Sequence, residues 1–107
     1  MVSVRVKVFF KYIVRGQSAT LSRDLGGFSK VNHLKSDLED EYQAAVKYLK
    51  LEKMPYSLES AVEGARVLMA YVDRDGDEMS ITDMYELDNA FFGAYRRERL
   101  RLIITIV

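Results

Sequence analysis

The sequence has no cysteine and a single histidine among its 107 residues. The chain can therefore form no disulfide and offers no thiolate to a metal, a composition that fits a cytoplasmic protein. Long hydrophobic runs are also missing, because the longest, at residues 102–107, is far shorter than the ~20 residues of a bilayer-spanning helix. The first strand-like segment interleaves Arg5, Lys7 and Lys11 with apolar residues, which is not the layout of a signal peptide.

A recognisable catalytic centre is lacking as well. His33 has no cysteine and no nucleophile motif to work with, so the base, orienting group and oxyanion donors of an enzyme cannot be assigned. Gly26-Gly27 has neither the spacing nor the following lysine of a phosphate-binding loop. We expect no enzymatic activity, no catalytic residue and no cofactor.

The charges are balanced in number but segregated along the chain. Residues 1–35 hold seven Lys or Arg and one acid, residues 36–95 hold fourteen acids against five bases, and residues 96–107 hold four Arg and one Glu. Such a chain can attract copies of itself, while its zero net charge gives no general attraction to nucleic acid. Solvated faces that simply differ in charge are the plainer alternative.

Hydrophobic periodicity predicts one α+β domain spanning residues 1–107. Alternation at residues 2–12 indicates a strand with one buried face, followed by a turn and a short strand at 18–22 that Gly26-Gly27 should end. Apolar residues recurring every three or four positions over 31–49 predict a long helix, with Ser29 as its cap.

The second half of the chain repeats this strand–helix pattern. Residues 57–63 have the pattern of a short helix, and residues 66–72 and 78–81 that of strands. A helix capped by Thr82 and a final strand at 101–107 complete an α+β roll with the order β-β-α-β-β-α-β.

The segment Asp73-Arg74-Asp75-Gly76-Asp77, here called the acidic loop, is the strongest candidate binding site. It begins like a calcium loop, but Glu78 and Met84 stand where an EF-hand needs glycine and glutamate, so we expect no metal. Acidic turns are often merely solvated. Here the flanking strands and the following helix should also bring Glu86 near the three aspartates, and such a group favours a cationic partner.

These features resemble the PB-one (Phox-and-Bem) interaction domain, a family with a ubiquitin-like β-grasp fold. The family's acidic signature is an aromatic-led Asp-x-Asp-Gly-Asp turn followed by an acidic residue and leucine, matched here by Tyr71 with the acidic loop and by Glu86-Leu87. A lysine on the outer face of the first strand is its second device, and Lys7 matches it. The resemblance covers essentially the whole chain.

The resemblance implies a two-faced module that docks head to tail. Lys7 of one copy would bind Asp73, Asp75, Asp77 and Glu86 of the next copy, or of another PB-one domain, and could build homo- or hetero-oligomers or filaments. A one-to-one heterodimer adaptor for a kinase, polarity or trafficking partner is the alternative. The position of Lys7 close to Met1 resembles the layout of sequestosome-type autophagy receptors and scaffolds.

Two departures from the family pattern affect the expected binding faces. Arg74 replaces an acid that is common in the family's loop, and the second strand lacks the paired arginines of some members. Candidates to complete the basic face are Arg5, Lys11, Arg15 and Arg23. The arginines at 96, 97, 99 and 101 are read first as the solvated end of the last helix and otherwise as an auxiliary basic patch. No aromatic platform for nucleic acid accompanies them.

Overall fold

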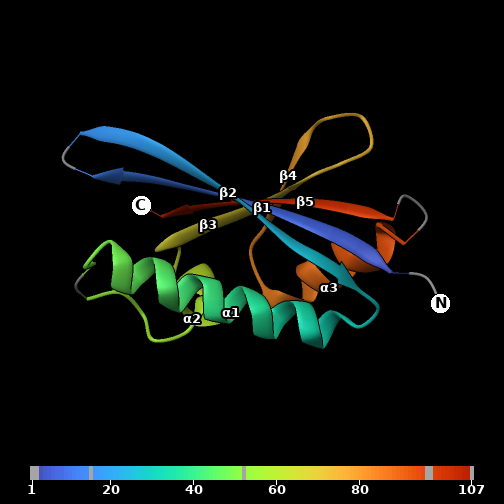
Figure 1. The fold of residues 1–107 in the computed structure, drawn as a ribbon, viewed down its shortest axis with the longest axis horizontal. Helices are drawn as coiled ribbons and strands as arrows, with labels where there is room; N and C mark the ends of the chain where they lie inside the picture. The colour runs from blue at the N-terminus through green and yellow to red at the C-terminus, as the bar shows by residue number, and fades with distance from the viewer. Residues whose placement is uncertain (1–2, 15, 52, 96–97, 107) are drawn as a thin grey trace.

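The computed structural model describes residues 3–14, 16–51, 53–95 and 98–106 of the chain (Figure 1). In these residues the strands are β1 (Val4–Val14), β2 (Gln17–Phe28), β3 (Val67–Val72), β4 (Glu78–Ile81) and β5 (Arg99–Ile106). The helices are α1 (Val31–Tyr48), α2 (Leu58–Glu63) and α3 (Met84–Gly93). The α+β class expected from the sequence is confirmed.

One mixed sheet carries the strands in the order β2-β1-β5-β3-β4. β1 and β5 are parallel neighbours, whereas the other neighbouring strands are antiparallel. The helices pack below the sheet in Figure 1, and the opposite side of the sheet, here called the outer face, carries none of the described helices. This architecture is compatible with a ubiquitin-like β-grasp.

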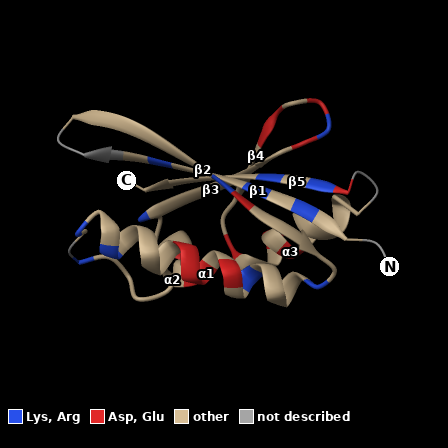
Figure 2. Cartoon of the chain, viewed as in Figure 1, with Lys and Arg blue, Asp and Glu red and all other residues tan. Residues whose placement is uncertain are grey.

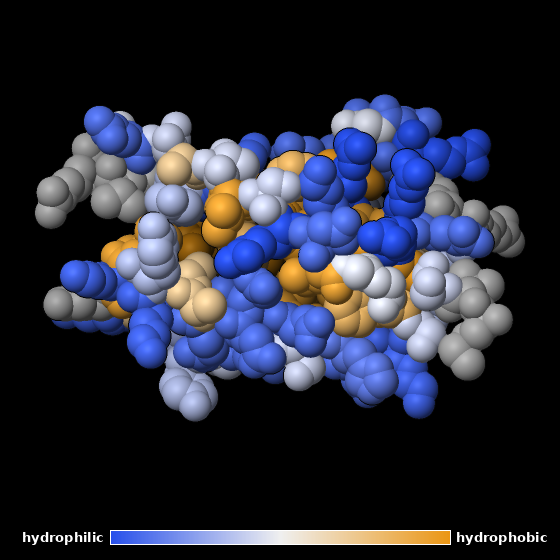
Figure 3. Space-filling view, in the orientation of Figure 1, coloured by the Kyte–Doolittle hydropathy of each residue, from blue (hydrophilic) through white to orange (hydrophobic). Residues whose placement is uncertain are grey.

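Alternation along the central strands builds the core between the sheet and the helices. Four residues of β1 that face the helices are at most 2% exposed, and they are Val4, Val6, Val8 and Phe10. Leu100, Leu102 and Ile104 of β5 meet them, and α1 contributes Leu34, Leu38 and Tyr42 to the same cluster. Figure 3 shows apolar residues emerging between the two layers. Because the side chains of a strand alternate, the intervening residues of β1 point to the outer face.

The second strand differs from the sequence expectation. It extends from Gln17 to Phe28, so Gly26 and Gly27 lie inside the strand rather than ending it. Pairing with β1 continues through a bulge in which Leu25 has no direct partner. Gly26 has φ +89°, a left-handed conformation that glycine adopts readily, which explains how the strand absorbs the extra residue.

The order of elements also needs a correction, because α2 follows α1 and gives β-β-α-α-β-β-α-β. The short helical pattern at residues 57–63 is confirmed. Ser57 caps α2 by accepting a hydrogen bond from the Ser60 N–H at 3.1 Å, and Gly64 follows as the C-cap. None of the described helices combines the length and hydropathy needed to cross a membrane.

Two predicted helix caps are each wrong by one residue. Lys30 precedes α1 without a capping side chain, and Ser29 instead accepts the Tyr95 hydroxyl on its carbonyl at 2.6 Å. Asp83, not Thr82, caps α3, because its carboxylate accepts the Glu86 N–H at 2.8 Å. The Thr82 hydroxyl instead donates a hydrogen bond to the side chain of Glu86 at 2.7 Å.

Candidate functional site

The acidic loop between β3 and β4 is a tight turn organised by its first residue. The Asp73 N–H donates to the Asp77 carbonyl at 2.8 Å, and the Gly76 N–H donates to the Asp73 carbonyl at 3.1 Å. Asp73 Oδ1 accepts the N–H groups of Asp75 and Asp77, both at 2.9 Å. Gly76 has φ +87°, so glycine suits the position where the turn reverses. The Asp73 carboxylate therefore shapes the loop.

The turn gathers three carboxylates on its surface. Oxygens of Asp73, Asp75 and Asp77 lie within 4.8 Å of one another, with Asp75 and Asp77 exposed and Asp73 partly buried. Like charges at this spacing repel, so the group favours a cation, either a metal ion or a Lys or Arg of another molecule. The ion pairs of the described residues are Arg5–Asp24, Arg23–Glu41 and Lys35–Asp88, and none includes the acidic loop.

Glu86 has a different task from the three aspartates. Its carboxylate accepts the Thr82 hydroxyl at 2.7 Å and the Thr82 N–H at 3.2 Å, and it is not part of the three-carboxylate group. It thereby fixes the passage from β4 into α3, at the end of β4 opposite to the loop. Arg74 is exposed within the turn, where its charge reduces the net negative charge of the loop.

Lys7 lies on the outer face of β1, as the alternation predicts. Its neighbours Val6 and Val8 are buried, whereas Lys7 itself is exposed. Its Nζ lies 5.4 Å from the centroid of the Phe9 ring, a cation–π contact that holds the ammonium group over the sheet. Lys7 takes part in none of the ion pairs of the described residues.

The other predicted basic residues divide between the two faces. Arg5 and Lys11 follow the alternation of β1 to the outer face, and Arg5 is 3.4 Å from Asp24. Arg23 pairs in register with the buried Val8, which places it on the helix side, 3.7 Å from Glu41. Arg15 lies outside the described residues.

Strand β2 contributes a negative charge to this region. Asp24 is the register partner of Lys7. The Gly26 N–H donates to its carboxylate at 3.0 Å, and the nearby Arg5 adds a favourable charge. The hydrogen bond first and the arginine second lower the pKa of Asp24 below its usual value, so this carboxylate is ionised at neutral pH.

The fold places two further cations beside Lys7, and the sequence indicated both as an auxiliary basic patch only in its second interpretation. α3 ends at Gly93, and Arg99 and Arg101 are exposed residues of β5, so assigning them to the end of the last helix was wrong. In the parallel register Arg99 is opposite Arg5 and Arg101 is opposite Lys7. Figure 2 shows these basic positions on adjacent strands. The alternation of basic and buried apolar residues from 99 to 102 is the signal that predicts them. Arg96 and Arg97 lie outside the described residues.

Lys7 and the acidic loop lie too far apart to neutralise each other within one molecule. The register across the sheet runs from Lys7 through Arg101 and Val72 to Glu78, the residue after the loop. Neighbouring strands are ~4.8 Å apart, so three steps separate Lys7 from Glu78 by about 14 Å. An ion pair needs about 4 Å. Figure 2 shows the acidic loop projecting beyond the basic bands of β1 and β5. Both charged surfaces are available to another molecule.

No protein-family model matches this sequence, and the comparison with curated proteins gives no match.

Proposed function

We propose that this chain is a PB-one-type interaction module that assembles head to tail, with the basic outer face of one copy binding the acidic loop of the next. The β-grasp-like topology supports the proposal, as do the turn geometry around Gly76 and the position of Lys7 on β1. The interface would be heterologous, so it need not close and can extend into chains.

One observation carries the proposal. Lys7 and the carboxylates of Asp75 and Asp77 are exposed on separate parts of the molecule and outside the ion pairs of the described residues. A surface that carries opposite charges at two separate places is complementary to a second copy of itself. An assembly module of this kind suits a cytoplasmic scaffold or a selective-autophagy receptor, and we place the chain in that class.

Mixing experiments test the two faces separately. Lys7→Ala should disable the basic face and Asp75→Ala should weaken the acidic loop, so each variant alone should give smaller species than the unsubstituted chain. An equimolar mixture of the two should form a dimer that does not grow, because each supplies the face that the other lacks. Size-exclusion chromatography with light scattering measures both results.

Lys47→Ala is the matched control, because Lys47 is an exposed lysine on α1, in the helix layer rather than on the outer face. It should assemble like the unsubstituted chain. Long oligomers in either Lys7→Ala or Asp75→Ala alone would contradict the head-to-tail model. An unsubstituted chain that stays monomeric at every concentration and pairs only with a different protein would favour the heterodimer adaptor.

A further inference from the structure

We propose that Arg99 and Arg101 of β5 complete the binding surface around Lys7, so that the acidic loop of a second copy docks along the seam between β1 and β5. The four residues Arg5, Lys7, Arg99 and Arg101 are here called the cationic strip. The inference rests on the proposed function and deepens it, because it assigns the residues that select and orient the partner.

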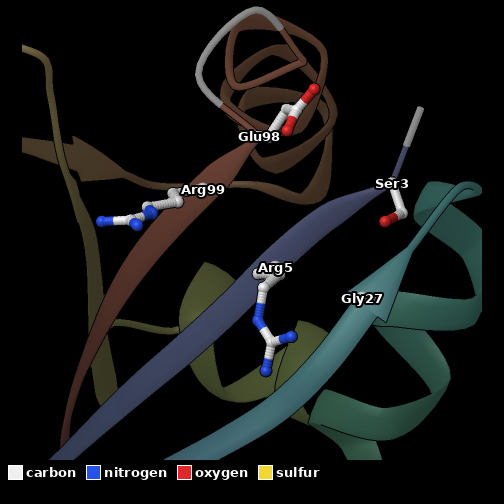
Figure 4. Close-up of a pocket in the computed structure, with 5 residues that line it drawn as sticks. All are labelled: Ser3, Arg5, Gly27, Glu98 and Arg99. Carbon is white, nitrogen blue, oxygen red and sulfur yellow. The ribbon is translucent and has the colours of Figure 1, made fainter.

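The parallel pairing of β1 and β5 creates the cationic strip. Arg5 is opposite Arg99 and Lys7 is opposite Arg101, with all four side chains exposed. A hollow of about 210 Å³ is bordered by these four residues together with Asp24. A second hollow of about 690 Å³ lies next to it, where Arg5 and Arg99 stand with Ser3, Gly27 and Glu98 (Figure 4). In Figure 4 the two guanidinium groups point away from each other, which moderates their repulsion.

Strand β2 cannot supply the same charge on the other side of β1. Its residue beside Lys7 is Asp24, which already lies 3.4 Å from Arg5. Its arginine, Arg23, lies on the helix side near Glu41. An approaching acidic loop is therefore repelled from the β2 side of Lys7 and attracted to the β5 side. The seam between β1 and β5 is the favourable place for docking.

The acidic loop matches this seam in charge. Its three aspartates hold oxygens within 4.8 Å of one another, and Lys7 and Arg101 are register partners on neighbouring strands. Carboxylates of the loop would thus face cations from two strands. Arginine also offers a planar pair of N–H donors that fits a carboxylate, whereas lysine offers a point charge. Arg101 would fix the orientation of the loop, and Lys7 would add attraction.

Binding at this surface can be measured between two variants, each of which has lost one of its two binding faces and therefore forms only a one-to-one complex. The donor carries Lys7→Ala and presents an intact acidic loop, and the receptor carries Asp75→Ala with Asp77→Ala and presents an intact cationic strip. Titration calorimetry between them gives one dissociation constant. Further substitutions are made only in the receptor, and thermal melting checks that each receptor is folded.

In the receptor, Arg101→Gln should weaken donor binding about fivefold, the upper range for one exposed ion pair, and Arg99→Gln with Arg101→Gln should weaken it further. Arg101→Lys should keep part of the affinity, because it retains the charge without the planar donors. Arg23→Gln should change the dissociation constant less than about twofold, because Arg23 lies on the helix side of the sheet.

The outcomes separate the inference from the proposed function. One outcome would contradict the inference: Lys7→Ala in the receptor abolishes binding, while the Arg99 and Arg101 substitutions change the dissociation constant less than about twofold. The binding surface would then be limited to β1, although the head-to-tail model would stand. If the unsubstituted strip fails to bind the donor, or binds it independently of Lys7, the proposed function itself is wrong.

Discussion

At the scale of single residues, the acidic loop divides its work among residues of one type. Asp73 uses its carboxylate on two N–H groups of the turn, while Asp75 and Asp77 keep theirs exposed. The Glu86 carboxylate accepts hydrogen bonds from the N–H and the hydroxyl of Thr82. We expect that substitutions of Asp73 change the shape of the loop, whereas substitutions of Asp75 and Asp77 change mainly its charge.

Tyr42 carries a prediction about stability at high pH. Its ring is 1% exposed, and its hydroxyl donates to the Pro55 carbonyl at 2.6 Å. Burial first, and the nearby Glu39 second, raise the pKa of this hydroxyl above its usual value of 10.0. The folded chain keeps the proton where the unfolded chain loses it, so this contribution is complete below pH 10 and is lost as the pH rises through the folded-state pKa.

Tyr42→Phe should therefore lower the free energy of unfolding by about 1 kcal/mol at neutral pH, through the lost hydrogen bond. Above pH 10 the difference from the unsubstituted chain should shrink, because phenylalanine has no proton to lose. Urea unfolding at pH 7 and pH 10.5 measures both effects. Tyr56→Phe is the control, since Tyr56 is 90% exposed. A constant difference at the two pH values would contradict the assigned pKa shift.

Only some residues of the candidate site could be predicted from the sequence. Lys7 and the three aspartates could be predicted, because alternation and turn chemistry are local properties of the sequence. The placement of Arg23 could not, since it depends on the register between β1 and β2. Whether Glu86 joins the aspartates or binds Thr82 depends on a side-chain rotamer that no sequence pattern specifies.

At the scale of elements, the end of β4 and the start of α3 are held together by side chains. Its cap, Asp83, accepts the Glu86 N–H at 2.8 Å, and Glu86 in turn holds Thr82 at the end of β4. The cap satisfies an N–H group that the helix cannot satisfy itself. The geometry of β4 and the start of α3 are thus coupled through two side chains.

Asp83→Ala should lower the free energy of unfolding by about 1 kcal/mol, the usual effect of removing a helix cap. Asp83→Asn should lower it less, because asparagine retains the capping oxygen and loses only the attraction of a charge to the helix dipole, about 0.3–1 kcal/mol. Urea unfolding of both variants with an unchanged slope provides the comparison. Equal losses in the two variants would show that the charge, rather than the hydrogen bond, stabilises the start of α3.

Strand and helix types could be predicted from periodicity, while several boundaries could not. β4 and the short α2 begin and end close to where their patterns predict. β5 begins at Arg99 rather than at residue 101, because pairing with β1 recruits residues that read as a helix end on their own. In the same way, the pairing of β2 with β1 extends β2 through Gly26 and Gly27, since tertiary contacts outweigh the local preference of glycine for turns.

At the scale of the whole molecule, the binding surfaces depend on contacts between distant parts of the sequence. The parallel pairing of β1 with β5 makes the first and last strands neighbours and puts Arg101 beside Lys7. The basic first third and the basic last segment of the sequence thus become one surface, while the acidic loop joins β3 and β4 farther along the sheet. No local pattern contains this pairing.

Assembly through these surfaces should be sensitive to salt. The Debye length falls from ~10 Å at 0.1 M to ~3 Å at 1 M ionic strength, so added salt weakens attraction between partly exposed charges. Single exposed ion pairs contribute only ~0–1 kcal/mol, which means that a cluster such as the cationic strip must act together. Light scattering at constant protein concentration should show that the mean mass of the assemblies falls as NaCl is raised from about 0.1 M to about 1 M, the range over which the Debye length shortens.

The strip also predicts how steep that salt dependence is. The Arg99→Gln, Arg101→Gln variant should assemble less at low salt and respond less to added salt, because fewer cations remain to be screened. Lys47→Ala should retain the slope of the unsubstituted chain, since its lysine lies on α1. An apolar contact would behave in the opposite way, because salts that are excluded from protein surfaces strengthen burial. A mean mass that is constant or rises with ionic strength would therefore assign the assembly to apolar residues and remove the acidic loop from it.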